Sequence, residues 1–361
     1  MDHFKPGVEN LSKRARRARV REEYQRQCRA AAGQYPAVVN DIPIGVTNAQ
    51  DTTRAPSPAV WKDISWSKMI ADPARHGIAI FDDFDRLPYS LTTNAESNFG
   101  QWDAWIGSSQ TIGDGIEEGG VAKLDGGSAN KSTTLSTRTG CFRFVGASTG
   151  YTLVGKKFAM EFRIALGSVS ASQQGVFIGV ADHTSSAISS SDTTIQASGG
   201  NTLTTTKNIF GFFNRTTTGP ADWSVVYQPA AGTAVYPTGL TTLVNTVTGS
   251  NMSAYAASTD KGKGTGFVKI GMRFDPTGSA QFTAAPATCP SGQTAGTVYR
   301  PTVTFYVNGV QAPAFLHPGI LQAATFPLTS VYSPVINYMN IAGGAAPIYL
   351  DWVRFGQGAS F

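Results

Sequence analysis

Charged residues are scarce in this chain of 361 residues, at 15% of the total, against about a quarter in a typical soluble domain. Glycine (39 residues) and aromatic residues (11%) are common instead; glycine disfavours helices, and aromatic residues favour strands. Hydrophobic residues still reach 41%, enough to bury a sizeable core, so disorder over the whole length is excluded. The composition predicts a mainly β protein.

Cysteine and histidine are also scarce. The three cysteines, Cys28, Cys141 and Cys289, are far apart, form no CxxC pair and share the chain with four histidines. This pattern argues against a disulfide framework or a structural zinc site, and it predicts synthesis in a reducing compartment. No metal and no cofactor are expected. No run approaches the 18 or so apolar residues of a membrane span, and the polar first residues predict no secretory signal, so we expect no membrane partner.

Positive charge is concentrated at one end of the chain. Residues 1–35 hold nine Lys/Arg and four Asp/Glu, a balance of +5. The remaining residues, 36–361, hold 20 of each, a balance of zero. The whole formal charge of +5 therefore resides in the N-terminal part, and any anionic partner is expected there.

An N-terminal helical arm is predicted over residues 1–35. Residues 8–32 contain no Gly or Pro and are rich in strong helix formers, and Gly33 supplies a stop. The apolar stripe is narrow, so the alternatives are a solvated helix and an arm that becomes ordered on a partner. The partner-binding residues expected on this arm are Leu11, Lys13, Arg14, Arg16, Arg17, Arg19, Arg21 and Tyr24.

The arm's basic run, residues 13–19, carries five positive charges in seven residues. Such a run can contact phosphates or an acidic protein surface, but it reads no base sequence by itself. No aromatic residue interleaves it, so stacking on bases is not predicted. Contact with nucleic acid and contact with protein both stay open.

Residues 36–80 are predicted to be an extended connector. Three prolines lie between positions 43 and 58, and neither the helical nor the strand period is present. Trp61 and Trp66 are expected to be the points at which this connector is pinned to another surface.

Residues 81–361 are predicted to form an antiparallel β-sandwich of the jelly-roll kind. Short β-branched or aromatic runs are bounded by Gly, Pro, Asn or Ser/Thr clusters. In residues 158–166, apolar side chains alternate with Glu161 and Arg163. Residues 184–207 and 229–264 are predicted to be long polar loops. The predicted strands are 158–166, 175–182, 209–214, 223–228, 267–275, 302–310, 336–342 and 347–355.

The order of several segments resembles the concanavalin A-like lectin/glucanase jelly roll, and most of all the versions found in structural proteins of tailed bacteriophages. The segments are FDDFDRL (81–87), FAMEFRIAL (158–166), VKIGMRFD (268–275), TFYVNGV (304–310) and SPVINYMNIAGGAAPIYLDWVRF (333–355). The resemblance covers about residues 81–356. It implies that the first and last strands pair, which would bring residues 81–84 next to residues 349–355. Lectins, glycosidases and scaffolds all use this fold, so fold alone does not fix function.

No catalytic residue is predicted. A glycosidase needs two carboxylates flanking the sugar, and the related glucanases carry Glu-x-Asp-x-x-Glu on one strand, a run that this chain lacks. Glu117 and Glu118 are adjacent and would face opposite ways on a strand, while Glu161 is the only acid on its strand and is interpreted as a surface acid. The Asp82, Asp83 and Asp85 cluster lacks the Gly and the distal Glu of a calcium loop.

Glycan binding would require exposed aromatic platforms with polar neighbours. The candidate glycan-binding residues are Trp102, Trp105, Trp223 and Tyr227. Core packing is the competing interpretation, because each ring must hide a large apolar area.

These observations predict a non-enzymatic virion protein of a tailed bacteriophage, made in the host cytoplasm. We expect a capsid decoration or cement protein that contacts the major capsid protein or neighbouring copies through residues 1–80 and forms a homo-oligomer. The alternative is a tail-associated, receptor-binding lectin-like module. Head, portal and tail locations stay open.

Overall fold

The computed structural model describes part of the chain. The chain divides into two compact units, Met1–Asn40 and Asp41–Phe361, and the described residues all belong to the second unit. They are residues 57–61, 77–84, 90–92, 96–99, 102–107, 110–114, 120–126, 128–137, 142, 157–170, 173–182, 208–214, 223–228, 252–257, 264–275, 280–281, 298–299, 302–316, 331–341 and 346–358. The predicted arm over 1–35, with all its candidate partner-binding residues, lies outside the described residues.

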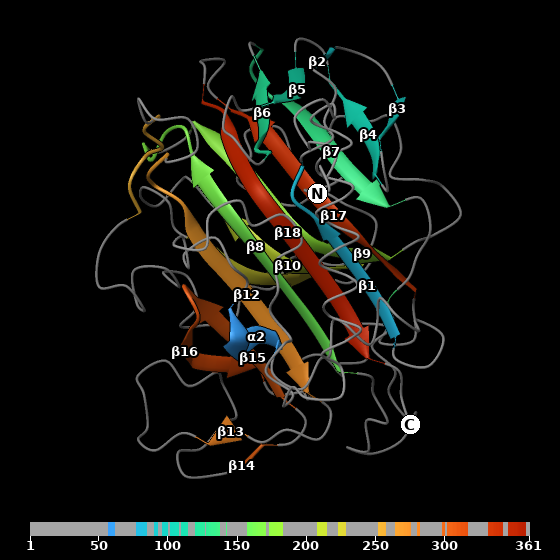
Figure 1. Cartoon of the computed structure of the whole chain (residues 1–361), viewed down its shortest axis with the longest axis vertical. Coiled ribbons are helices and arrows are strands. Elements are labelled where there is room, and N and C mark those ends of the chain that lie inside the picture. The colour runs from blue at the N-terminus through green and yellow to red at the C-terminus, as the bar shows by residue number, and fades with distance from the viewer. Residues whose placement is uncertain are drawn as a thin grey trace, which may run out of the picture. The chain divides into compact units, whose positions relative to one another are not determined.

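A nine-stranded antiparallel sheet forms one layer of the sandwich (Figure 1). Its path runs β16-β15-β12-β8-β18-β6-β5-β2, and β1 pairs with β18 off this path. The strands are β1 (Gly77–Asp82), β2 (Ser90–Thr92), β5 (Gln110–Asp114), β6 (Ala122–Gly126), β8 (Phe158–Leu166), β12 (Val268–Asp275), β15 (Thr302–Val307), β16 (Val310–Leu316) and β18 (Ile348–Gly358).

A seven-stranded antiparallel sheet forms the other layer, in the order β11-β10-β9-β17-β7-β4-β3. In Figure 1, β9, β10 and β17 run behind β8 and β18. The strands are β3 (Glu96–Phe99), β4 (Trp102–Ile106), β7 (Lys131–Thr137), β9 (Gln174–Asp182), β10 (Ile209–Asn214), β11 (Trp223–Gln228) and β17 (Tyr332–Asn340). A separate two-stranded ribbon joins β13 (Ala280–Gln281) to β14 (Val298–Tyr299). The predicted antiparallel β-sandwich is confirmed.

An aromatic core joins the inner faces of the two sheets. Phe162 of β8 lies 5.7 Å, centroid to centroid, from both Phe212 of β10 and Trp223 of β11. Phe212 in turn meets Phe305 of β15 at 6.0 Å. The expected alternation in β8 is confirmed, because Phe158, Met160, Phe162, Ile164 and Leu166 all belong to the central core cluster. Burial of these rings supplies much of the driving force for stacking the sheets.

The first strand pairs with the last, as the resemblance implies. Phe81 lies opposite Arg354 and Asp82 opposite Val353 in an antiparallel register between β1 and β18. β18 contains an irregularity between Leu350 and Trp352, so that Asp351 is the extra residue against β8. Both Leu350 and Val353 belong to the core cluster, so the bulge changes which residues of β18 face inward.

Three predicted element boundaries are corrected by the backbone. The run 302–310 is a strand followed by a turn, because Asn308 and Gly309 both adopt positive φ (50° and 81°) between β15 and β16. This Asn-Gly pair has the conformation of a two-residue hairpin turn. The sandwich also begins at Gly77 rather than at residue 81, and β17 begins at Tyr332 rather than 336.

The predicted extended connector over 36–80 is helical at one described point. Residues Pro58–Trp61 form α2, a single helical turn, which contacts β8 and β12 and overlies the β12–β15 region in Figure 1. Within the described part of the chain, no helix is long and apolar enough to cross a membrane.

Candidate functional site

The segment 57–61 begins with a serine and a proline that favour a helical turn. The Ser57 carbonyl accepts hydrogen bonds from the amides of Val60 (3.1 Å) and Trp61 (3.4 Å). Pro58 stands at the first helical position, where its fixed φ suits a helix and its missing N–H costs nothing. The turn places Val60 and Trp61 against the sheet, where both are fully buried.

Glu161 receives this segment on the outer face of the nine-stranded sheet, opposite the aromatic core. The Glu161 Oε2 atom accepts hydrogen bonds from the Ser57 amide (2.8 Å) and from the Trp61 indole Nε1–H (3.2 Å). The second oxygen, Oε1, is buried and has no hydrogen-bond partner. Glu161 is 1% exposed, so its interpretation as a surface acid is wrong: the chain's own upstream segment covers it.

Burial changes the ionisation of Glu161. Desolvation raises the pKa of this carboxyl from its ordinary value of 4.5 to about 7, although the hydrogen bonds from Ser57 and Trp61 and the charge of Lys269 act in the opposite direction. Desolvation dominates because the docked segment keeps water from the carboxylate. Glu161 therefore titrates near neutral pH.

The groove that holds the segment has an apolar wall and a cationic edge. Val60 and Trp61 pack with Ala159 and Tyr306 in one buried cluster. The guanidinium of Arg354, which lies opposite Glu161 in the register of β18 and β8, lies 4.2 Å from the centroid of the Trp61 ring. This cation–π contact adds to the burial of the indole.

Gly271 of β12 makes room for the segment. A Cβ atom added at Gly271 would lie 3.0 Å from Val60 Cγ2 and 3.1 Å from Glu161 Cγ. Such distances are closer than ordinary van der Waals contact, so a larger residue at Gly271 would compete with Val60 for the same space. We call the surface formed by Ala159, Glu161, Gly271, Tyr306 and Arg354 the docking groove.

Arg163, two residues further along the same face of β8, is buried in a different way. Its guanidinium Nη1 donates to Asp351 Oδ2 at 2.6 Å, and its Cζ lies 4.2 Å from the centroid of the Phe267 ring. Asp351 is the bulged residue of β18. The bulge thus brings the carboxylate to an arginine on the neighbouring strand.

Partly exposed aromatic rings lie near this ion pair. Tyr255 stacks on Tyr349 with centroids 3.8 Å apart, and it meets Phe267 edge-on at 5.9 Å. All three rings are half-buried. Residues 252–257 fall within the predicted loop 229–264, and Tyr255 donates its amide to the Leu166 carbonyl at the end of β8 (2.7 Å).

Lys123, opposite Tyr349 in the register of β6 and β18, forms an ion pair with Asp125 at 2.8 Å. Burial alone would lower the pKa of Lys123, but the hydrogen bond and charge of Asp125 outweigh burial and raise it. The side chains of Lys123 and Asp125 are 36% and 22% exposed, so water screens this pair.

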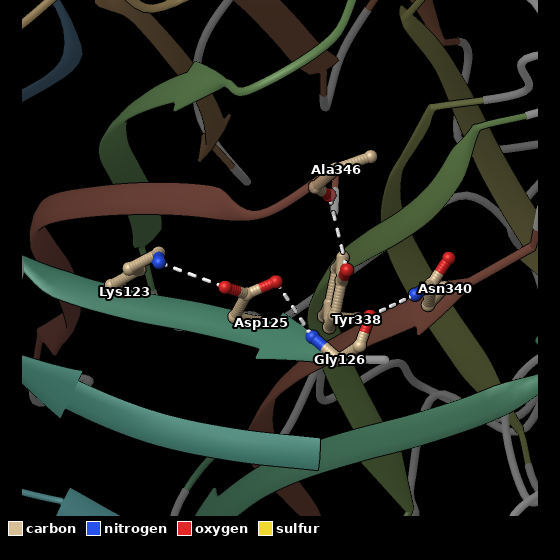
Figure 2. A network of polar contacts seen from close by, with 6 residues as sticks. All are labelled: Lys123, Asp125, Gly126, Tyr338, Asn340 and Ala346. Atoms are coloured by element: carbon tan, nitrogen blue, oxygen red, sulfur yellow. Dashed lines mark hydrogen bonds and ion pairs between the residues drawn. The ribbon is translucent and has the colours of Figure 1, made fainter. Parts of the chain in front are cut away.

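Beside this ion pair, a polar network ties β6 of one sheet to β17 of the other (Figure 2). The Gly126 amide donates to Asp125 Oδ1 (2.8 Å), and the Gly126 carbonyl accepts from Asn340 Nδ2. The Tyr338 hydroxyl donates to the Ala346 carbonyl at 3.0 Å. Burial raises the pKa of Tyr338, and the charge of Asp125 adds to that rise. The network satisfies polar groups that are otherwise hidden between the sheets.

The candidate glycan-binding residues do not form one exposed platform. Trp102 and Trp223 are 1% and 0% exposed in the central core, and Trp102 Nε1–H donates to Asp82 Oδ2 at 2.7 Å. Trp102 and Trp223 are therefore core residues and not an exposed glycan-binding platform, because neither ring presents a face to solvent. Trp105 is half-buried on β4. Tyr227 lies on β11, and its side chain is outside the described residues.

Other acids that the sequence singled out have structural partners. Asp82 accepts two hydrogen bonds: Oδ1 accepts one from the Phe84 amide (2.8 Å), and Oδ2 accepts one from the Trp102 indole N–H. Asp182, which the sequence did not single out, accepts both the amide and the side-chain N–H of Asn208. Glu117, Glu118 and Asp85 lie outside the described residues. Among the described residues, no three His, Cys, Asp or Glu side chains gather to hold a metal ion.

The docking groove has one signal in the sequence, which is the presence of Trp61 in the predicted connector; Trp66, the other expected pinning point, lies outside the described residues. Trp61 is buried on another surface, as predicted for a pinning point. The acceptor Glu161 could not be identified as its partner, because the two residues are 100 positions apart.

No protein-family model matches this chain, and no curated protein matches it. Solved structures that it is similar to include a basic winged bean lectin bound to Tn-antigen. That likeness has 9% sequence identity and a TM-score of 0.40, and covers 78% of this chain and 98% of the lectin.

The carbohydrate recognition domain of Emp47p is similar at 11% identity and a TM-score of 0.38, over 77% of this chain and 100% of that domain. A carbohydrate esterase from the Shiga toxin-encoding bacteriophage phi24B is similar at 15% identity and a TM-score of 0.33, over 72% of this chain and 90% of the esterase. At these identities and scores, the similarities carry no inference about what this chain binds or does.

Proposed function

We propose that the protein is a non-enzymatic structural component of a tailed-bacteriophage particle. In this proposal the N-terminal part attaches the protein to the major capsid protein or to neighbouring copies, and the β-sandwich is carried on the particle as a decoration or cement protein. The sequence resemblance to phage structural proteins supports this assignment, as does the separation of charge between the first 35 residues and the rest of the chain.

The docking of residues 57–61 is the observation that carries the proposal. A segment upstream of the sandwich is fixed to the sheet by two buried apolar side chains and by two hydrogen bonds to Glu161. This segment is therefore held at a defined place on the sandwich surface. A pulling force applied to the N-terminal part would act on this docked turn before it acted on β1. This order along the chain is what we expect of a segment that attaches the protein to a particle.

The acids of the sandwich support a structural role over a catalytic one. Each buried carboxylate among the described residues accepts hydrogen bonds from structural donors: Glu161 from Ser57 and Trp61, Asp351 from Arg163, and Asp182 from Asn208. A hydrolase of sugars needs two carboxyl groups facing one open site. These acids are instead used to join strands and segments.

Particle incorporation tests the proposal. Full-length protein and a variant without residues 1–35 would be supplied to particles that lack the protein, and occupancy would be measured by quantitative gel analysis of purified particles. We expect the truncated protein to fold, with a β-type circular dichroism spectrum, but to be lost from the particles. A charge variant with Gln at Lys13, Arg14, Arg16, Arg17 and Arg19 should also lose occupancy. Full occupancy of the truncated protein would contradict the proposal.

Glycan binding is the second candidate function, and one observation favours it. The half-buried rings of Tyr255, Tyr349 and Phe267 lie beside the partly exposed pair Lys123–Asp125, which combines apolar ring surface with hydrogen-bonding groups. Screening the full chain on a glycan array tests it. A specific signal that Tyr349→Ala abolishes and Asp351→Glu retains would establish a lectin role, and absence of any signal at millimolar glycan would remove it.

A further inference from the structure

The docking groove buries an acid that lacks one of its hydrogen-bond partners. Glu161 offers two oxygens, and both the Ser57 amide and the Trp61 indole donate to the same one, Oε2. The Ser57 hydroxyl, which also acts on the carboxyl, is buried without a hydrogen-bond partner. Oε1 is enclosed without a donor. An ionised carboxylate in this position would leave half of its charge without a donor, whereas a neutral carboxylic acid keeps Oε2 as an acceptor at lower cost.

The charged groups around Glu161 come from every strand that packs against it. Lys269 and Arg273 lie on β12, in register with Arg163 and Ala159 of β8. Arg354 of β18 lies directly opposite Glu161 in the register, and Tyr306 of β15 closes the apolar side of the groove. Arg163, two residues away on β8, is bonded to Asp351.

These cations favour the ionised form of Glu161, and water, where it reaches the carboxylate, favours that form as well. With residues 57–61 docked, the carboxyl is excluded from water and its burial opposes the charge. With the segment undocked, the same carboxylate faces solvent beside Lys269 and Arg354 and ionises easily. Docking and ionisation therefore oppose each other, and the equilibrium between the two states is linked to pH.

We propose that residues 57–61 form a pH-controlled latch: the docking groove binds this segment when Glu161 is protonated and releases it when Glu161 ionises. The latch holds residues 57–61 against the sandwich under mildly acidic conditions and frees them under mildly alkaline ones. This inference depends on the groove alone and holds whichever proposed function is correct.

The expected size of the effect follows from linkage. If the carboxyl titrates near 7 when docked and at its ordinary 4.5 when undocked, the docking equilibrium weakens by between one and two orders of magnitude from pH 5 to pH 8. The weakening is monotonic as pH rises. If an ionised carboxylate–cation pair held the segment instead, docking would weaken as pH falls, because protonation would remove the negative charge.

Hydrogen exchange in the full chain measures the latch directly. The protection of the amides of Ser57, Val60 and Trp61 would be followed by mass spectrometry at pH 5, 6, 7 and 8, and divided at each pH by the exchange of the free peptide 55–63. We expect protection to fall by roughly 10- to 100-fold between pH 5 and pH 8. Protection that stays constant or rises over this range would overturn the proposal.

Glu161→Gln supplies the matched variant, because the amide mimics the neutral acid and cannot ionise. Its protection at 57–61 should change less than about threefold between pH 5 and pH 8 after the same correction. Asp125→Asn, the same chemical change at a partly exposed site, should keep the wild-type fall. If protection of residues 57–61 falls as much in Glu161→Gln as in the wild type between pH 5 and pH 8, the proposal is overturned.

Gly271→Val gives a second test if Glu161→Gln does not fold. Valine suits a strand, but its side chain occupies the space of Val60, so the segment should be unprotected at every pH. Thr265→Val, at an exposed position, is the control. Wild-type protection with a wild-type pH profile in Gly271→Val would show that the segment does not dock in this groove.

Discussion

Strand β8 carries two charged residues on its outer face, and the molecule buries them in different ways. Arg163 meets an opposite charge, Asp351, at 2.6 Å. Glu161 meets two neutral N–H groups of the chain's own upstream segment. The buried Arg163–Asp351 contact joins two opposite charges, whereas burial raises the pKa of Glu161 to about 7, so that this carboxyl can take up a proton near neutral pH. The face thus has an ion-paired end at Arg163 and a protonatable end at Glu161.

The largest effect is expected from breaking the ion-paired end. Asp351→Asn leaves the Arg163 guanidinium buried opposite a neutral amide, which should lower the free energy of unfolding by about 3 to 5 kcal/mol. Urea denaturation followed by circular dichroism measures this loss. A change below about 1 kcal/mol would show that Arg163 finds water or another partner, and the contrast between the two ends would disappear.

Trp61→Ala should have the next largest effect, and it should be local. It removes a fully buried indole and one bond to Glu161, at a cost of about 3 kcal/mol or less, since the segment can leave the groove without unfolding the sandwich. Limited trypsin digestion should cut after Lys62 at least about ten times faster than in the wild type. Trp61→Phe keeps a ring and loses only the N–H, so its acceleration should be smaller. Equal cleavage rates in all three proteins would contradict docking.

The pH dependence of stability separates the two ends of β8. The pKa of Glu161 is raised on folding, so the native state holds a proton that the unfolded state has lost between about pH 4.5 and pH 7. Its contribution to stability is therefore full below pH 4.5 and is lost as pH rises through about 7. Relative to Glu161→Gln, the wild type should lose about 2 kcal/mol between pH 5 and pH 8 in urea titrations. If the wild type instead becomes more stable relative to Glu161→Gln as pH rises, Glu161 is ionised when the segment is docked.

The smallest effect is expected at the Lys123–Asp125 pair. Both side chains are partly exposed, so Asp125→Asn should cost less than about 1 kcal/mol, and added salt should shrink the difference from the wild type. Parallel urea titrations at 0.05 and 0.5 M salt measure this. A loss as large as that of Asp351→Asn would mean that the network under the pair, through Gly126 and Asn340, depends on the charge of Asp125.

The sequence predicts much of the sandwich because its central strands are strongly patterned. The run 158–166 alternates apolar with charged residues, and it coincides with β8. The strands β2 to β7 were not predicted, since their sequences are rich in Ser, Thr, Gly and Asp and resemble loops. Burial in β7, where Ser132 and Thr133 are hidden, comes from the tertiary structure, and short-range pattern does not encode it.

The candidate site was less predictable, because it depends on contacts between distant residues. Glu161 has the pattern of a solvent-facing strand residue, and only the return of residues 57–61 makes it a buried acceptor. Trp102 has the polar neighbours of a sugar platform, but its ring faces the core and its N–H is bound by Asp82. In both cases the surroundings of the side chain depend on segments far away in the chain, which local sequence does not reveal.

Electron cryomicroscopy of purified particles tests the central claim, that the N-terminal part attaches the protein and the sandwich is carried. The account predicts density for the sandwich at the particle surface, with the turn 57–61 in the docking groove at mildly acidic pH and residues 1–35 packed against a neighbouring subunit. Residues 1–35 extending freely into solvent, while the sandwich itself makes all contacts with the particle, would contradict it.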